Sequence, residues 1–477
     1  MTTLSFANWK FEWPLWRTRT PAQRNMRGFH SLLVAFAATM CNSAVSLADP
    51  AHEPYTCSWQ AGGAMGGTET MSLVAHDGKL YAGIGYWEDT QPYPGARILV
   101  LDSPTAQWRV EHTFSEKVNG VALYKRVAAL KEITFRFDGK GHQLSAPVSL
   151  MLAANDLTRD VPTADLAVFS RDDSGQWMKM TLPIAGRGIR SLGFYHDSCS
   201  GADFVFAGTY KNGFVRGSYD ASLPGKIRWS PNPESADPVV EHRIMAFGES
   251  GGKLYAFSKP RVYEYAGGAS PLWRSVFAYP NDELHYTSGL RGATEINGEL
   301  FGVLEGLGFE SKIYKFFPAV EVLNISHFLK TQLGTDFLSP GENQGDTNII
   351  GAYNNITKVI DPITQQDAWL VGLGFSQKRR CPFPGQANNS WFLARSATGT
   401  WTVHEIPSLN FNDPQPCPCA VRTIAVSPFA QDQRQVIYIG FYDTHGLPCH
   451  DTAHIFRVGL ARALQTNAVD PPPPAKH

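Results

Sequence analysis

The sequence predicts an all-β protein built from repeated antiparallel sheets. Of its 477 residues, 12% are aromatic, 43 are glycine and 32 are proline, and no amphipathic stretch of helical length stands out. This composition favours short strands joined by turns. The pentapeptide Gly-Lys-Leu-Tyr-Ala, which begins at Gly78, occurs again from Gly252. Such a repeat indicates an architecture in which one structural unit recurs along the chain.

The two segments around this pentapeptide have the same order of features. Residues 71–114 and 243–277 each contain an apolar run, a tight turn, a second apolar run, a loop, a third apolar run and a turn that leads to tryptophan. This order predicts four short antiparallel strands in each unit. Similar units occur in residues 189–230, 291–317, 367–406 and 422–460, and a degenerate one occurs in residues 118–183.

A single four-stranded sheet cannot bury both of its apolar faces, whereas a ring of such sheets buries each face against a neighbour. We therefore expect a seven-bladed β-propeller of four-stranded antiparallel blades, with six or eight blades as alternatives because the second and fifth units are irregular. The seventh unit has only three strands. The segment around Trp59 is expected to complete this last blade as its outer strand, beside the strand that contains Ile455.

Tryptophan recurs in the fourth predicted strand of several units. Because a bulky ring fills the space between neighbouring blades, we interpret these side chains as core residues rather than as ligand platforms. They are Trp108, Trp177, Trp229, Trp273 and Trp401.

The first 48 residues have the features of a secretory signal with a long basic region, and Met26 is a better start than Met1. Arg27 precedes the apolar run "SLLVAFAATM", and small residues suited to cleavage follow at Ser46 and Ala48. The apolar run is too short to span a membrane. We expect a secreted or periplasmic protein with one β-propeller domain over residues 49–464 and a disordered proline-rich tail over residues 465–477.

Charge and motifs limit the classes of partner. Without the first 48 residues the chain has a net charge of −5, which argues against nucleic acid as a partner. It contains no phosphate-binding loop, dinucleotide fingerprint or nucleophile elbow, and we predict no cofactor. The expected protein is a monomer that binds a small anionic molecule, a glycan or another protein.

The order of the units resembles that of kelch-like and sialidase-like β-propellers over nearly all of the chain after residue 48. The segment "SRDDSGQW" at residues 170–177 is similar to the Asp-box of sialidases but has one additional residue between Asp172 and Gly175. The Gly-Gly pair that kelch units carry after the second strand is absent. The resemblance implies the fold, matches no specific family and transfers no catalytic residue.

Arginine recurs where the innermost strand of several units begins, at Arg190, Arg243, Arg291 and Arg422. In a propeller these positions meet at one mouth of the central channel, where guanidinium groups suit a carboxylate, sulfate or phosphate. Together with His242, these arginines are the predicted ligand-binding residues for an anionic or carbohydrate-like ligand. The alternative is that each arginine pairs with a neighbouring acid and holds the blades together; the candidate acids are Glu69, Glu241 and Glu295.

Two other functions remain open: a glycosidase or other hydrolase or lyase that uses the same face, and a protein-interaction scaffold. Glu88, Asp89 and Glu305 are the candidates for catalytic acids, since glycoside hydrolysis commonly uses a pair of carboxylates. His445, His450 and His454 are side chains that could bind a metal, but their spacing matches no zinc signature, and no metal is predicted.

Six cysteines remain after residue 48, and an even number in an exported chain suggests disulfides. Four of them fall in loops expected on one face and in one sector, where two disulfides would link the loops; they are Cys381, Cys417, Cys419 and Cys449. Cys57 and Cys199 have no obvious partner, so one of them is a candidate free thiol.

Overall fold

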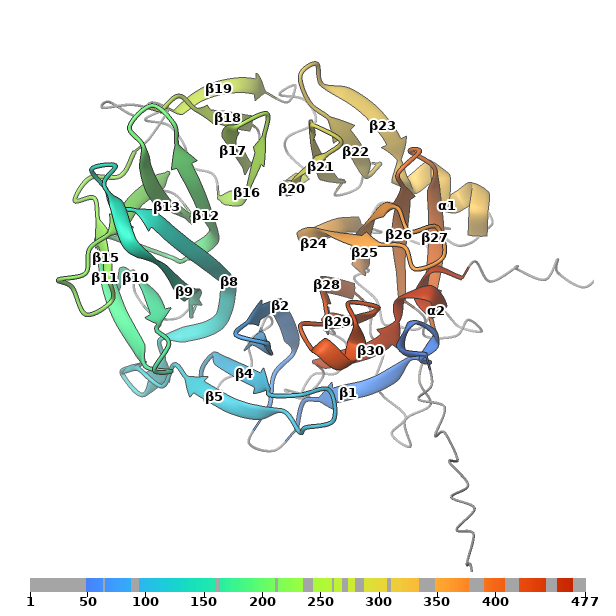
Figure 1. The fold of residues 1–477 in the computed structure, drawn as a ribbon, viewed down its shortest axis with the longest axis horizontal. Coiled ribbons are helices and arrows are strands. Elements are labelled where there is room, and N and C mark those ends of the chain that lie inside the picture. The colour runs from blue at the N-terminus through green and yellow to red at the C-terminus, as the bar shows by residue number, and fades with distance from the viewer. Residues whose placement is uncertain are drawn as a thin grey trace, which may run out of the picture. The chain divides into compact units, whose positions relative to one another are not determined.

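The computed structural model describes residues 49–62, 65–86, 94–158, 161, 164–210, 213–234, 243–259, 261–267, 273–278, 287–306, 310–333, 348–376, 390–407, 420–442 and 453–465. They belong to one unit that extends from Leu47 to His477. This unit is dominated by antiparallel strands, as the sequence predicts (Figure 1).

Successive strands pair as antiparallel four-stranded meanders. In chain order they are β2 (Glu69–His76), β3 (Lys79–Gly85), β4 (Arg97–Leu101) and β5 (Arg109–Thr113); β8 (Tyr124–Phe137), β9 (Gln143–Leu157), β10 (Ala164–Arg171) and β11 (Trp177–Gly186); β12 (Ile189–Asp197), β13 (Ala202–Thr209), β14 (Phe214–Tyr219) and β15 (Ile227–Trp229); and β16 (Ile244–Ser250), β17 (Lys253–Ser258), β18 (Arg261–Tyr265) and β19 (Trp273–Ala278). They continue with β20 (Thr287–Ile296), β21 (Glu299–Gly306), β22 (Lys312–Lys315) and β23 (Val320–Asn324); and β24 (Asn348–Ile360), β25 (Asp367–Ser376), β26 (Ser390–Ser396) and β27 (Trp401–Ile406).

The most C-terminal strands are joined by a strand from the other end of the described chain. β28 (Ala420–Val426), β29 (Val436–Tyr442) and β30 (His454–Gly459) form a meander, and β1 (Thr56–Gln60) pairs antiparallel with β30. In this pairing Trp59 lies opposite Ile455. The Trp59 side chain is buried and packs in one apolar cluster with Ile455 and Leu73.

The repeated glycines form tight hairpin turns. Asp77 and Gly78 have φ angles of 48° and 69°, and they join β2 to β3. Gly251 and Gly252 have φ angles of 58° and 72°, and they join β16 to β17. Two consecutive residues with positive φ are typical of the type I′ turn, whose twist matches that of paired strands. The repeated pentapeptide therefore marks the same hairpin in two meanders.

The first strands of the meanders line the centre of the unit in Figure 1. They are β2, β8, β12, β16, β20, β24 and β28, each of them contacts the next, and β28 contacts β2. Apolar clusters fill the space between neighbouring meanders. For example, the Trp273 ring of β19 stacks on the Phe214 ring of β14 with 4.0 Å between centroids. Trp108 and Trp273 are buried core residues as expected, whereas Trp177, Trp229 and Trp401 are only partly buried beside the core.

Some elements differ from the expectation. The segment interpreted as a degenerate second unit forms a complete four-stranded meander, and its first two strands, β8 and β9, have 14 and 15 residues. A helix that the sequence pattern did not indicate, α1 (Ile325–Leu333), follows β23 and buries Ile325 and Leu329. The remaining short elements are η1 (Pro50–His52), β6 (Lys117–Val118), β7 (Val121–Ala122), η4 (Ala430–Asp432) and α2 (Leu460–Leu464). None of the helices in the described residues has the length and apolar character needed to cross a bilayer.

Candidate functional site

Three of the four predicted arginines meet at a single aromatic ring, that of Tyr353. The guanidinium carbons of Arg190, Arg291 and Arg422 lie 4.9, 4.3 and 3.5 Å from the centre of this ring. All three arginines are buried, and they come from β12, β20 and β28. Arg243, the fourth predicted arginine, is half-buried and lies over the ring of Tyr210 at 4.2 Å.

Tyr353 reaches the centre because β24 bulges away from its partner strand. Gly351 pairs with Leu373, but the next pair is Ile356 with Val371, so four residues of β24 face a single residue of β25. Ala352, the first of the four, has a φ angle of 48°, which is unusual for a residue with a Cβ atom. Bulges of this kind redirect side chains and occur often at functional sites.

The bulge is held by hydrogen bonds from other meanders. Arg190 Nη2 donates to the Tyr353 carbonyl at 3.2 Å and to Asn354 Oδ1 at 2.7 Å, and Arg291 Nη1 donates to the same carbonyl at 3.4 Å. Asn354 Nδ2 in turn donates to the Met71 carbonyl of β2. These contacts tie β24 to β2, β12 and β20, so the bulge has a structural role as well as a position at the centre.

Arg126, which the sequence analysis did not identify, completes the group. This side chain of β8 is fully buried and donates to Asp156 at 2.5 Å and to Glu69 at 3.0 Å. The Tyr210 hydroxyl also donates to Asp156, at 2.6 Å. Arg126 was missed because residues 118–183 did not align with the other units. The available signal was an arginine near the beginning of an innermost strand, as at the four predicted positions.

We call this group the arginine–tyrosine cluster; its members are Arg126, Arg190, Arg243, Arg291, Arg422, Tyr210, Tyr353, Glu69, Asp156 and Glu305. Some of its charges form close pairs. Arg291 donates to Glu305, one of the predicted acids, with Nη2 at 2.6 Å and Nε at 2.8 Å. Glu69 lies 3.0 Å from Arg126 but 3.7 Å from Arg422. Ion pairing, the alternative that the sequence left open, therefore accounts for part of the cluster.

Part of the buried Arg422 guanidinium has no hydrogen-bond partner among the described residues. Its guanidinium carbon lies between the rings of Tyr353 and Tyr442, at 3.5 and 3.9 Å from their centres. Within the described residues, Arg422 Nε and Nη1 and Arg190 Nε have no hydrogen-bond partner. Buried polar groups without a partner are rare and call for an explanation, such as a ligand or water. Among the described residues the cluster has five arginines for three carboxylates, so their positive charge is in excess while Tyr353 is neutral.

The surrounding charges alter the acidity of Tyr353. Burial alone would raise its pKa, but the positive charges of Arg422, Arg126, Arg190 and Arg291 together outweigh burial and lower the pKa to about 7. Burial also lowers the pKa of Arg190 to about 10, which still leaves it protonated at neutral pH. Tyr353 can therefore exchange a proton near neutral pH, which an ordinary tyrosine cannot do.

Several predicted site residues lie outside the described residues; they are Glu88, Asp89, His242, His445, His450, Cys381, Cys417, Cys419 and Cys449. His454 is buried at the beginning of β30, and its carbonyl accepts from Thr70 Oγ1 at 3.2 Å. In the described parts of the chain, no group of three or more His, Cys, Asp or Glu side chains is placed to hold a metal. Cys57 and Cys199 are both exposed free thiols.

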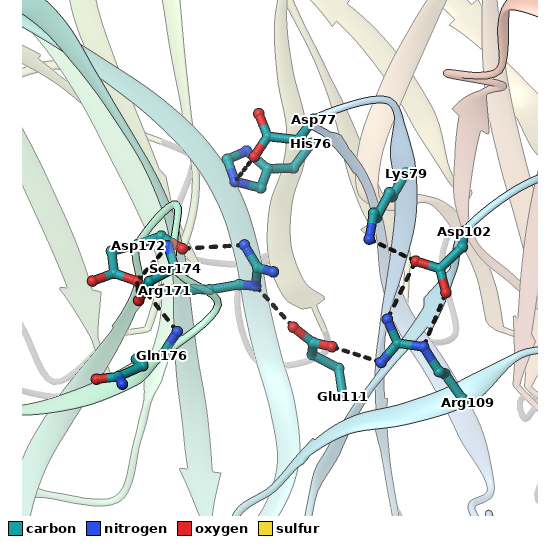
Figure 2. A network of polar contacts seen from close by, with 10 residues as sticks. All are labelled: His76, Asp77, Lys79, Asp102, Arg109, Glu111, Arg171, Asp172, Ser174 and Gln176. Carbon is teal, nitrogen blue, oxygen red and sulfur yellow. Dashed lines mark hydrogen bonds and ion pairs between the residues drawn. The ribbon is translucent and has the colours of Figure 1, made fainter.

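The segment that resembles an Asp-box forms a turn in a separate polar network (Figure 2). Asp172 Oδ1 accepts from the backbone N–H groups of Ser174 and Gln176 at 3.0 and 3.2 Å. In the same network, Glu111 joins Arg171 to Arg109, which also pairs with Asp102. This network connects β5, β10 and Asp102, the residue after β4, and contains no member of the arginine–tyrosine cluster.

The repeated four-stranded antiparallel meanders, whose first strands lie side by side, have the architecture of a β-propeller. No family model matches it, and no curated protein matches its sequence. Among solved structures it is similar to a GH74 enzyme of Niastella koreensis, with 13% identity and a TM-score of 0.44 over 81% of this chain and 52% of the enzyme. The chain thus spans about half the length of that enzyme. It is also similar to the NanB sialidase of Streptococcus pneumoniae, with 8% identity and a TM-score of 0.38 over 86% of this chain and 71% of the sialidase.

Proposed function

We propose that this protein is a β-propeller binding module that holds the anionic group of a small, carbohydrate-like molecule at the arginine–tyrosine cluster. The observation that carries the proposal is the buried Arg422 guanidinium, which has two nitrogens without hydrogen-bond partners in the described residues. A carboxylate or sulfate would accept from one of these nitrogens and balance the charge of the guanidinium. Because Nε and Nη1 lie on different edges of the guanidinium, a second acceptor, such as water or a ligand hydroxyl, would serve the other nitrogen.

The excess of arginines over carboxylates supports an anion rather than a neutral ligand at this position. Arg291 and Arg126 are already engaged by close acids, whereas Arg422 Nε lies 3.7 Å from Glu69 Oε2. Tyr210, Tyr442 and Arg243 are only half-buried, so they provide the side from which a ligand would approach. Tyrosine rings beside arginines are suited to the apolar face of a sugar and to its hydroxyl groups.

The ring geometry in this proposal has seven blades, with β1 as the outer strand that closes the last blade. The pairing of β1 with β30 and the contact of β28 with β2 support it. We also propose that residues 1–48 direct the chain to export and that residues 49–464 form the propeller domain. The motivating observation is the apolar run of residues 31–40 with its basic flank.

Arg422→Met is expected to weaken the binding of galacturonate by about 1.5–3 kcal/mol, the usual contribution of a hydrogen bond to a charged group. Galactose, which lacks the carboxylate, should bind equally to both proteins. Isothermal titration calorimetry measures both affinities. Arg109→Met, which changes a half-exposed residue of the network in Figure 2, is the matched control and should leave galacturonate binding unchanged. If Arg422→Met lowered thermal stability but left galacturonate affinity intact, Arg422 would have only a structural role.

A second candidate function is acid–base catalysis on such a ligand, which the lowered pKa of Tyr353 favours. The wild-type protein should show tyrosinate ultraviolet absorption that appears with a midpoint near pH 7, and Tyr353→Phe should lack this transition. Ionisation of Tyr353 stabilises the folded protein, because the pKa of Tyr353 in the folded state lies below the usual value of 10.0. This stabilisation is complete above pH 10.0 and is lost as the pH falls through about 7. Conversion of an oligogalacturonate by the wild type but not by Tyr353→Phe would establish catalysis. Binding of the oligogalacturonate without conversion would support a binding module and argue against catalysis.

A further inference from the structure

A cavity of about 270 Å³ lies further along the innermost strands than the arginine–tyrosine cluster. Its lining includes Ser191 and Leu192, which follow Arg190, and Thr423, which follows Arg422. Residues of β2, β8, β12, β16, β20, β24 and β28 all contribute to its wall. Tyr353 is not part of this wall, although the neighbouring Asn354 is. The cavity volume is near the lower end of the range for small-molecule pockets, which begins at about 300 Å³.

Two cationic side chains line the cavity. Among the described residues, Arg190 and Lys131 are the only charged ones in its wall, and no described Asp or Glu contributes to it. The remaining wall has an apolar part and a polar part. The apolar part includes Leu130, Leu192, Met245, Phe247 and Ile356; the polar part consists of Ser72, Ser191, Thr423, Asn354 and Asn355. Such a combination of an apolar wall and a few polar groups is typical of sites for small organic molecules.

Lys131 has no close partner in the described residues. No ion pair or hydrogen bond joins its ammonium group to another described side chain. Burial lowers the pKa of Lys131, and the negative charge of Glu249 opposes this effect only in part. The Lys131 side chain is partly buried, and a bound anion would supply the close opposite charge that its ammonium group lacks among the described residues.

We propose that this cavity is a second ligand site, which takes a small monocarboxylate with a compact apolar body. The carboxylate would face Lys131, and the body would pack against Leu192, Met245 and Phe247. The positive charge of Arg190, whose Nε has no described partner, adds to the attraction for an anion. The site shares only Arg190 with the arginine–tyrosine cluster, so it does not depend on the function proposed for that cluster.

Hexanoate is the probe for this proposal, and hexanol is its neutral counterpart of the same chain length. The wild-type protein should bind hexanoate in calorimetric titration at millimolar concentration. Lys131→Met should weaken this binding at least about tenfold, which corresponds to about 1.4 kcal/mol, and should leave the weaker binding of hexanol unchanged. Lys131→Arg keeps the charge and should retain hexanoate binding.

Arg422→Met distinguishes the two sites, because it should impair galacturonate binding at the cluster but leave hexanoate binding intact. Lys131→Gln provides a second uncharged variant if Lys131→Met does not fold, as judged by circular dichroism. Three results would overturn the proposal: no hexanoate binding by the wild type, equal hexanoate affinity for the wild type and an uncharged Lys131 variant, or binding of hexanol as tight as that of hexanoate.

Discussion

Arg126→Met is expected to lower the free energy of unfolding by about 3–5 kcal/mol, the usual effect of removing one partner from a buried ion pair. Arg126 is completely buried and donates to both Asp156 and Glu69, which are themselves buried. Without the guanidinium, two carboxylates remain in a place that water does not reach. Urea-induced unfolding followed by circular dichroism measures the effect.

The control for this variant is Arg109→Met, which removes a pair of similar type on the surface. Arg109 is half exposed and pairs with Asp102 and Glu111 in the network of Figure 2. Because exposed pairs contribute about 0–1 kcal/mol, its unfolding curve should nearly coincide with that of the wild type. A similar loss of unfolding free energy in both variants would mean that burial does not explain the contribution of Arg126 to stability.

Trp59→Ala should also destabilise the protein by about 3–5 kcal/mol, as is usual when a large aromatic side chain is removed from a core. The Trp59 side chain is only 5% exposed and packs in the same apolar cluster as Ile455 and Trp108. If β1 closes the ring as proposed, this loss weakens the pairing of β1 with β30, which connects the two ends of the propeller. Thermal unfolding and limited proteolysis between β1 and β2 measure this weakening.

Thr56→Ala on the same strand is the matched control, since Thr56 is exposed and its hydroxyl makes a single long hydrogen bond of 3.4 Å to the Arg457 carbonyl. Its stability should change by less than about 0.5 kcal/mol, as for most surface substitutions. Should Trp59→Ala unfold like Thr56→Ala, β1 would be a peripheral strand, and the proposed closure would be wrong.

Features that depend on neighbours in the sequence were predictable. The Asp77-Gly78 and Gly251-Gly252 turns and the apolar runs on either side of them predict the hairpins that the structure contains. The recurrence of arginine near the beginning of the innermost strands predicted a central group, and Arg190, Arg291 and Arg422 do meet there. A repeated unit places equivalent residues at equivalent positions, so this inference needed only an alignment of the units.

Features that arise from contacts between distant segments were not predictable. The sequence around Tyr353, "GAYNNIT", has no glycine or proline in its bulged part and so gave no signal for a bulge. Arg126 was missed because its unit has long strands that do not match the other units. The cavity near Lys131 combines residues from β2 to β28, which no local pattern connects.

The sequence by itself determined the strand order, the hairpin turns and the class of the fold, because these depend on local backbone preferences and on the alternation of apolar residues. Only the tertiary structure decided which charges are paired. Glu305 engages Arg291, Glu69 lies closer to Arg126 than to Arg422, and Tyr353 comes to lie among the arginines. The physical reason is that pairing and pKa depend on distances of a few ångströms between strands that are far apart in the chain.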